Sequence, residues 1–323
     1  DLMRAAQGGK LLPGYDFVSG ESSSSFLAAN DGNGRDDDPS DPGDWVSAAD
    51  LGNPVFDDCD VDRSSWHGTR VAGVIAAKTA NNEGMAGVDW NTWILPVRVM
   101  GKCGGRDSDI MAAMRWAAGF EVPGVPTNPY PAKIINLSLG GSGVCTSAYQ
   151  NVASELAARG VLIVASAGNE GGAVSAPANC NGVLGVTGVR HVGTKVGFTN
   201  LGPAADIAAP GGNCINVSGG ACLFSIVTAT NLGETIPQAS GYTDQFNFNV
   251  GTSFSAPLVA GTAALMHAVN PRLGTQHLIN RIKQSSAAFP PNPDPATIPT
   301  CRIPTPGDIQ DVECACTTDT CGA

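Results

Sequence analysis

The sequence predicts an α/β fold with three layers, in which a mostly parallel β-sheet is covered by helices on both faces. From residue 67 onward, short β-branched runs alternate with helical patterns, and this alternation is typical of βαβ units. The 323 residues include 42% hydrophobic and only 15% charged residues, enough apolar side chains for one large core. The 41 Gly and 22 Pro provide many turns. We therefore expect a single domain over residues 1–323.

The expected elements follow one another in a regular order. β-Branched apolar runs predict strands at 93–100, 133–139, 161–167 and 183–189. Helical patterns lie at 67–78, 107–118 and 146–159. Residues 254–269 are small and apolar on every side, which predicts a buried central helix. Outside the alternation lie an acidic insertion loop at 31–62, a polar segment at 231–249 and a Pro- and Cys-rich tail at 289–323.

Charge and hydropathy exclude two classes of partner. The net charge is −11, from 18 Lys and Arg against 29 Asp and Glu, and such a surface repels nucleic acid and anionic membranes. No run of apolar residues is long enough to span a bilayer. The acid is concentrated in the loop at 31–62, where eleven Asp face one basic residue, Arg35. Such a run fits either a solvated face or a set of metal ligands.

The cysteines indicate an oxidising compartment. There are ten, an even number, and none has the spacing of a zinc site, so disulfides in an exported protein are the favoured interpretation. Free buried cysteines in a cytosolic enzyme are the alternative. The chain opens at Asp1 with no Met and no apolar leader, so we expect a start that is either processed or cut.

The search for a general base is short because the chain has only four histidines. His67 begins the run His-Gly-Thr-Arg-Val-Ala-Gly, in which two glycines allow another side chain to approach closely. A histidine here also fits a purely structural role, in which the imidazole only satisfies hydrogen bonds. The remaining histidines have polar or helix-surface surroundings and no such glycines: His191, His267 and His277.

Two further runs carry candidate residues. In Gly-Thr-Ser-Phe-Ser-Ala-Pro, Ser253 stands at the start of the buried helix, near free N–H groups and the positive end of the dipole. That position suits a nucleophile whose substrate becomes an oxyanion, and it also suits a plain N-cap. Asn169 follows Gly168 at the end of an apolar strand, where an amide can donate to a ligand, although Gly-Asn is also a common turn dipeptide.

Taken together and in this order, the three runs resemble those of the subtilisin-like serine proteases, the subtilase family. Two supporting runs are Ile-Asn-Leu-Ser-Leu-Gly-Gly at 135–141, which resembles the family's substrate-binding strand, and Ala-Pro-Gly at 209–211. The resemblance covers nearly the entire chain. It implies a secreted serine endopeptidase that cuts peptide bonds through an acyl-enzyme. A Gly-x-Ser-x-Gly elbow is absent around Ser253, which disfavours a lipase-type hydrolase.

The resemblance also implies a role for each matching residue. Ser253 would be the nucleophile, His67 the base, and Asn169 a donor to the oxyanion. Small apolar walls suggest that large apolar side chains are accepted, and Glu170 would admit basic ones as well. The residues expected to bind substrate are Ser138, Leu139, Gly140, Ala165, Gly168 and Glu170.

The pattern lacks one catalytic group. The family's aspartate stands in an Asp-Thr-Gly or Asp-Ser-Gly turn, and neither occurs here. We expect that the first strand of the family's sheet, which bears it, is absent and that the chain is truncated at both ends. The fragment alone should then be nearly inactive. A non-catalytic pseudoprotease that binds extended peptides is the alternative. Loop aspartates near His67 in sequence are poor substitutes because no strand delivers them: Asp57, Asp58, Asp60 and Asp62.

The resemblance favours structural Ca²⁺ in the acidic loop, on the oxygen ligands Asp31, Asn33, Asp36, Asp38 and Asp44. By proximity we expect the disulfides Cys59–Cys103, Cys145–Cys180 and Cys214–Cys222. The four tail cysteines would pair among themselves, with Cys314 and Cys316 taking different partners. The expected partner is a peptide or protein substrate, with a removed propeptide and a monomeric enzyme, and with neither nucleic acid nor membrane.

Overall fold

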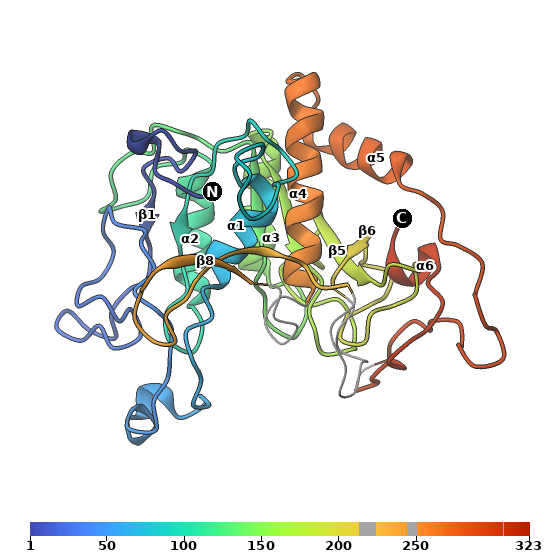
Figure 1. Ribbon diagram of the computed structural model, residues 1–323, viewed down its shortest axis with the longest axis horizontal. Helices are drawn as coiled ribbons and strands as arrows, with labels where there is room; N and C mark the ends of the chain where they lie inside the picture. Colours follow the sequence, from blue (N-terminus) through green and yellow to red (C-terminus); the bar gives the residue numbers. More distant parts are fainter. Residues whose placement is uncertain (213–223, 244–250, 306) are drawn as a thin grey trace. The chain divides into compact units, whose positions relative to one another are not determined.

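The computed structural model describes residues 1–212, 224–243, 251–305 and 307–323 (Figure 1). They form two compact units. Unit 1 comprises residues 1–86, 90–132 and 229–242, and unit 2 comprises 87–89, 133–228 and 243–323. The acidic loop belongs to unit 1 and the Cys-rich tail to unit 2. No helix among the described residues has both the length and the apolar character needed to cross a membrane.

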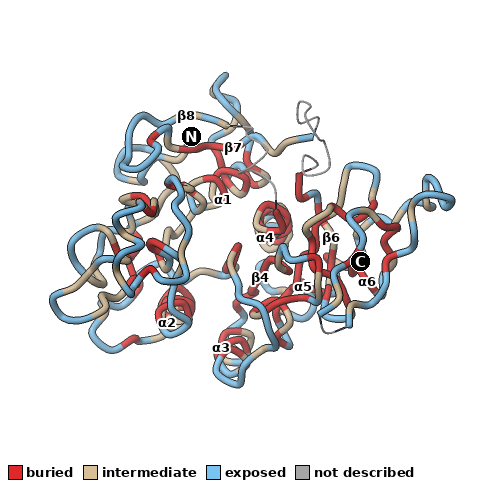
Figure 2. The backbone as a smooth tube through the Cα atoms, turned by 90° about the horizontal axis from the view of Figure 1, so that it is seen from below, coloured by how far each residue is buried: buried red, intermediate tan, exposed pale blue. Residues whose placement is uncertain are grey.

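Unit 2 is built on a four-stranded parallel sheet in the order β3-β4-β5-β6. The strands are β3 (Ile134–Leu137), β4 (Leu162–Ser166), β5 (Val183–Val189) and β6 (Ile207–Pro210). Its helices are α3 (Ser147–Ala158), α4 (Thr252–Val269), α5 (Thr275–Ser285) and α6 (Thr318–Cys321). Figure 2 shows α4 and α3 on opposite sides of β4, which confirms the predicted helices on both faces.

Helix α4 is the centre of unit 2 and packs against all four strands. Small side chains let it approach the sheet closely, since Ala256 and Ala263 are 0% exposed. Gly261 is required on another side of the helix, because a Cβ there would lie 2.7 Å from the Cβ of Val88. The first two thirds of the helix therefore form part of the core. The burial predicted for the whole of 254–269 is wrong for its last third, where Leu265 is 43% and Val269 87% exposed.

Unit 1 carries the helices α1 (His67–Ala76) and α2 (Asp107–Ala117) and the short parallel pair β1 (Tyr15–Asp16) and β2 (Val97–Arg98). Three 3₁₀ turns lie at Ala5–Gln7, Asp50–Gly52 and Pro54–Phe56. The rings of Tyr15, Phe17 and Trp116 form its aromatic core, with centroids 5.2 to 5.7 Å apart. The strands β7 (Thr228–Asn231) and β8 (Ser240–Thr243) pair with each other, and residues 229–242 belong to this unit.

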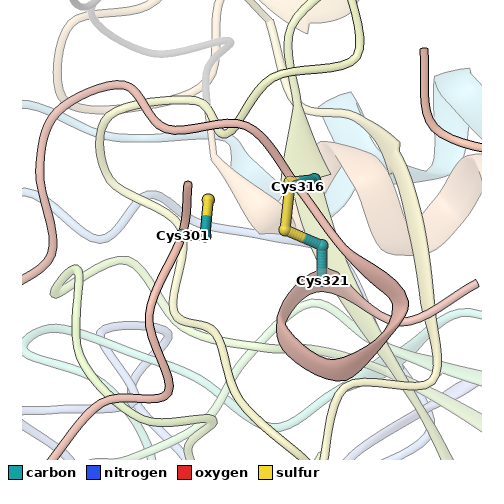
Figure 3. A group of neighbouring side chains, drawn as sticks. All are labelled: Cys301, Cys316 and Cys321. Atoms are coloured by element: carbon teal, nitrogen blue, oxygen red, sulfur yellow. A yellow bond between two sulfur atoms is a disulfide. The ribbon is translucent and has the colours of Figure 1, made fainter. Parts of the chain in front are cut away.

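The disulfides largely follow the expected pattern. Cys59–Cys103 and Cys145–Cys180 are confirmed, and the tail forms Cys301–Cys314 and Cys316–Cys321. Cys214 and Cys222 lie outside the described residues. Figure 3 shows the bonded Cys316 and Cys321 with Cys301 beside them. These tail cysteines pack on Leu201, which is 0% exposed, so the tail contributes to the core of unit 2.

Candidate active site

Ser253 is the second residue of α4 in unit 2. The backbone bends sharply before it, because the N-cap Gly251 has φ +140°, a conformation that other residues rarely adopt. The Gly251 N–H donates to the carbonyl of Gly211 at 2.9 Å, and the Ser255 hydroxyl donates to the carbonyl of Pro210 at 3.2 Å. The Ala-Pro-Gly run at the end of β6 thus supports the start of α4.

A proline inside α4 couples Ser253 to the end of β3. Pro257 has no N–H, so the carbonyl of Ser253, four residues earlier, lacks its helical donor. The Ser138 hydroxyl donates to that carbonyl at 2.6 Å instead. In return, the Ser253 hydroxyl donates to the carbonyl of Ser138 at 3.4 Å. The nucleophile candidate is therefore held against the strand that resembles the substrate-binding strand.

Asn169 lies beside the same helix start. Its Oδ1 accepts from the backbone N–H of Thr252 at 2.9 Å and from the Thr252 hydroxyl at 3.0 Å. With Oδ1 engaged in this way, the Nδ2 donors of Asn169 are turned away from Thr252. The side chain is exposed, and its amide can therefore donate to a ligand bound next to Ser253. Within unit 2 the structure thus brings together Ser138, Asn169 and Ser253.

The remaining pocket residues predicted from the sequence flank this group. Leu139 and Gly140 continue directly from Ser138, and a Cβ on Gly140 would lie 2.5 Å from the carbonyl oxygen of Ala176. Ala165 is on β4 and is 0% exposed. Gly168 has φ +107° and lies directly after the apolar run at the end of β4. Glu170 is exposed as a residue, but one of its carboxylate oxygens accepts the Asn169 N–H at 3.0 Å.

His67 opens helix α1 in unit 1. It follows Trp66, whose left-handed backbone (φ 49°) is unusual for a bulky residue and costs about 1–2 kcal/mol. The indole of Trp66 is 2% exposed and donates to the carbonyl of Gly233 at 2.6 Å, which holds this conformation. Desolvation lowers the pKa of His67, and the negative charge of Asp44 opposes that shift. A lowered pKa keeps the imidazole neutral, as a general base requires.

The aspartates near His67 in sequence remain at the surface. Asp57, Asp58, Asp60 and Asp62 are all exposed, in keeping with the expectation that no strand delivers them. Asp44 instead accepts from the N–H and the hydroxyl of Ser65, both at 2.6 Å. It fixes the turn that leads into α1 and so helps to place His67.

The four carboxylates among the five predicted calcium ligands accept from protein donors, and the fifth residue, Asn33, is one of those donors. Asp31 pairs with Arg98 at 2.7 Å, and the Asn33 amide donates to Asp36 at 2.6 Å. Asp38 pairs with Arg4 at 3.0 Å. Among the described residues, only Cys301, Cys316 and Cys321 place three ligand atoms of His, Cys, Asp or Glu together, and these cysteines are disulfide-bonded. As arranged here the five residues do not fit an assembled Ca²⁺ site, because cationic side chains occupy two of the carboxylates.

Comparison with known proteins identifies the class of protein that this fold and site define. The model of the subtilase family matches residues 22–298, and the chain belongs to that family. The fold is accordingly the subtilisin-like α/β fold that the sequence predicts. A solved protease structure from Pseudoalteromonas arctica has 40% identical residues and a TM-score of 0.78, and covers 87% of this chain and 79% of its own.

Two named relatives are similar over most of the chain. An extracellular protease of Xanthomonas campestris is 39% identical over 86% of this chain, and an extracellular basic protease of Dichelobacter nodosus is 41% identical over 80% of it. The aligned regions amount to 44% and 40% of those proteins' own lengths. The chain thus spans less than half of each of these relatives.

Sequence reasoning missed Asn200 and Ser175 as parts of the site. Asn200 is 1% exposed and bonds to the loop that carries Asn169 and Glu170. It is 31 positions from Asn169 in the chain and belongs to none of the motif runs. The stretch that follows β5 also contains Arg190, His191 and Lys195, so no sequence pattern singles out this amide.

Proposed function

We propose that the protein is a secreted serine endopeptidase. The observation that carries the proposal is the cluster at the start of α4, where Ser253 exchanges hydrogen bonds with Ser138 and the neighbouring Thr252 donates to the amide of Asn169. Membership of the subtilase family and the names of the two extracellular relatives support it. Peptides and proteins are the proposed substrates.

In the proposed reaction, Ser253 Oγ attacks the scissile carbonyl carbon and His67 takes its proton. The negative charge that forms on the carbonyl oxygen is stabilised by donation from the Asn169 amide and from the backbone N–H of Ser253. When the C–N bond breaks, His67 gives the proton to the leaving amine. Water then hydrolyses the ester on Ser253, with His67 acting again as base. The lowered pKa of His67 supports this role because it keeps the imidazole unprotonated, as a proton acceptor must be.

We propose that the polypeptide of residues 1–323 has little activity by itself. It contains no Asp-Thr-Gly or Asp-Ser-Gly run, and loss of the carboxylate that orients the histidine of a protease triad costs on the order of 10⁴ in turnover. A longer protein that includes such a run would supply that carboxylate. We also propose a monomeric enzyme with a removed propeptide, and Ca²⁺ bound at the acidic loop after Arg98 or Arg4 has released its carboxylate.

The test compares peptide hydrolysis by the complete protein and its Ser253→Ala and His67→Ala variants. Each variant should lose nearly all turnover, and a serine-directed phosphonate should label the parent at Ser253. Ser154→Ala, a change on the surface of α3, is the matched control and should retain full activity. Hydrolysis that persists in Ser253→Ala would refute the proposal. Peptide binding without any hydrolysis by the parent would favour a pseudoprotease.

A further inference from the structure

Asn200 is buried in unit 2, and all the hydrogen bonds of its side chain are made with one short loop. Its Oδ1 accepts from the N–H of Glu170 at 3.0 Å and of Gly172 at 2.9 Å. Its Nδ2 donates to Glu170 Oε2 at 2.6 Å and to the Ser175 hydroxyl at 3.0 Å. A carboxamide offers two donors and two acceptor positions, and here all four are used. Residues 168–175, which we call the Asn169 loop, are therefore held in place by hydrogen bonds to a side chain in the core.

The same residue also holds the backbone on both sides of Asn169. The Asn200 N–H donates to the carbonyl of Gly168 at 3.0 Å, while Oδ1 holds the N–H of Glu170. Packing is close at this point, since a Cβ on Gly168 would lie 2.2 Å from Asn200 Nδ2. The buried side chain of Asn200 thus determines the direction in which Asn169 presents its amide.

Asn200 also orients the carboxylate of Glu170. Glu170 Oε2 accepts from Asn200 Nδ2 at 2.6 Å and from the Asn169 N–H at 3.0 Å. An oxygen with two donors at this distance is turned toward the loop and is less available to the cationic side chain of a bound substrate. The sequence suggested that Glu170 admits basic substrate side chains, whereas this geometry favours apolar ones.

We propose that Asn200 is a positioning residue that determines specificity. It aligns the Asn169 amide for the oxyanion, and it withholds the Glu170 carboxylate from the primary pocket so that apolar side chains are preferred over basic ones. The inference rests on the proposed protease function and adds a preference among substrates.

The test uses Asn200→Asp in the complete protein. The new carboxylate is the same size and can still accept from the two N–H groups, but it cannot donate to Glu170 and repels it. With peptides that differ only in Phe or Lys before the cut, kcat/KM for Lys relative to Phe should rise about fivefold, the upper range for one partly exposed ion pair. For the Phe peptide, kcat should fall about tenfold with KM nearly unchanged, because Asn169 acts on the transition state.

Two further variants separate specificity from general damage. Glu170→Gln in the Asn200→Asp background should abolish the gain for Lys, because the released charge is gone. Asn179→Asp is the matched control: this half-buried amide donates to the carbonyls of Gly143 and Val174 at 2.8 and 2.9 Å and does not bond Glu170. It should leave the Lys to Phe ratio unchanged. If Asn200→Asp does not fold, Ser175→Ala removes one of the four partners, and a smaller shift in the same direction is expected.

The outcomes distinguish the two proposals. If Ser253→Ala and Asn169→Ala lose activity as expected but neither Asn200→Asp nor Ser175→Ala changes the Lys to Phe ratio, the inference about Asn200 is wrong and the protease function stands. If Ser253→Ala remains active, the protease function itself is wrong.

Discussion

The carboxyl group of Asp16 makes the stability of unit 1 depend on pH. Asp16 is 0% exposed, and desolvation raises its pKa from 3.8 to about 7, although Arg98 opposes the shift. Arg98 donates to Asp16 and also pairs with Asp31 at 2.7 Å. One guanidinium thus serves two carboxyl groups, and the more deeply buried of them retains its proton up to near neutral pH.

The sign and the magnitude of the effect follow from this pKa. Between pH 3.8 and about 7 the folded protein keeps a proton that the unfolded chain has released, so the free energy of unfolding falls as pH rises through this range. A shift of about three pH units at about 1.36 kcal/mol each limits the loss to about 4 kcal/mol. Asp16→Asn has nearly the same shape and does not titrate. Its stability relative to the parent should therefore increase by up to about 4 kcal/mol between pH 4 and pH 7.5.

Urea unfolding followed by tryptophan fluorescence measures this directly. All five tryptophans of the chain belong to unit 1, so their emission reports on the unit that contains Asp16. Asp57→Asn, a change at an exposed aspartate, is the control. Its free energy of unfolding should depend on pH in the same way as that of the parent. If the free energy of unfolding of Asp16→Asn also follows that of the parent, Asp16 is ionised over the whole pH range and the reasoning from its burial fails.

Three further predictions concern the site and the loops. Asn169→Ala in the complete protein should lower kcat by about 10² to 10³, as steady-state kinetics would show, and an effect confined to KM would contradict the oxyanion role. Ser138→Ala should lower stability by about 1–3 kcal/mol because Pro257 leaves the Ser253 carbonyl without another helical donor; an unchanged urea midpoint would count against this coupling. Chelation of Ca²⁺ should lower the melting temperature, and a melt insensitive to chelator would remove the calcium proposal.

Much of unit 2 could be predicted from periodicity. The β-branched runs that end at Leu137, Ser166 and Val189 form strands of a parallel sheet, and the helix predicted at 254–269 begins only two residues earlier. In unit 1 prediction was weaker. The strand expected at 93–100 is reduced to Val97–Arg98, because Pro96 directly before it has no N–H to continue the ladder with β1.

Local chemistry in the sequence was sufficient to predict the candidate reactive groups. Ser253 and Asn169 stand in short runs whose glycines and helix start are readable without coordinates, since a helix terminus and a strand end are local features. The contacts that hold these groups join residues far apart in the chain. Asn200 bonds a loop 30 residues earlier, and Ser138 donates to a carbonyl 115 residues later. Such pairs produce no periodic pattern of residues in the sequence. Only the packing of strands and helices brings their donors and acceptors into hydrogen-bonding range.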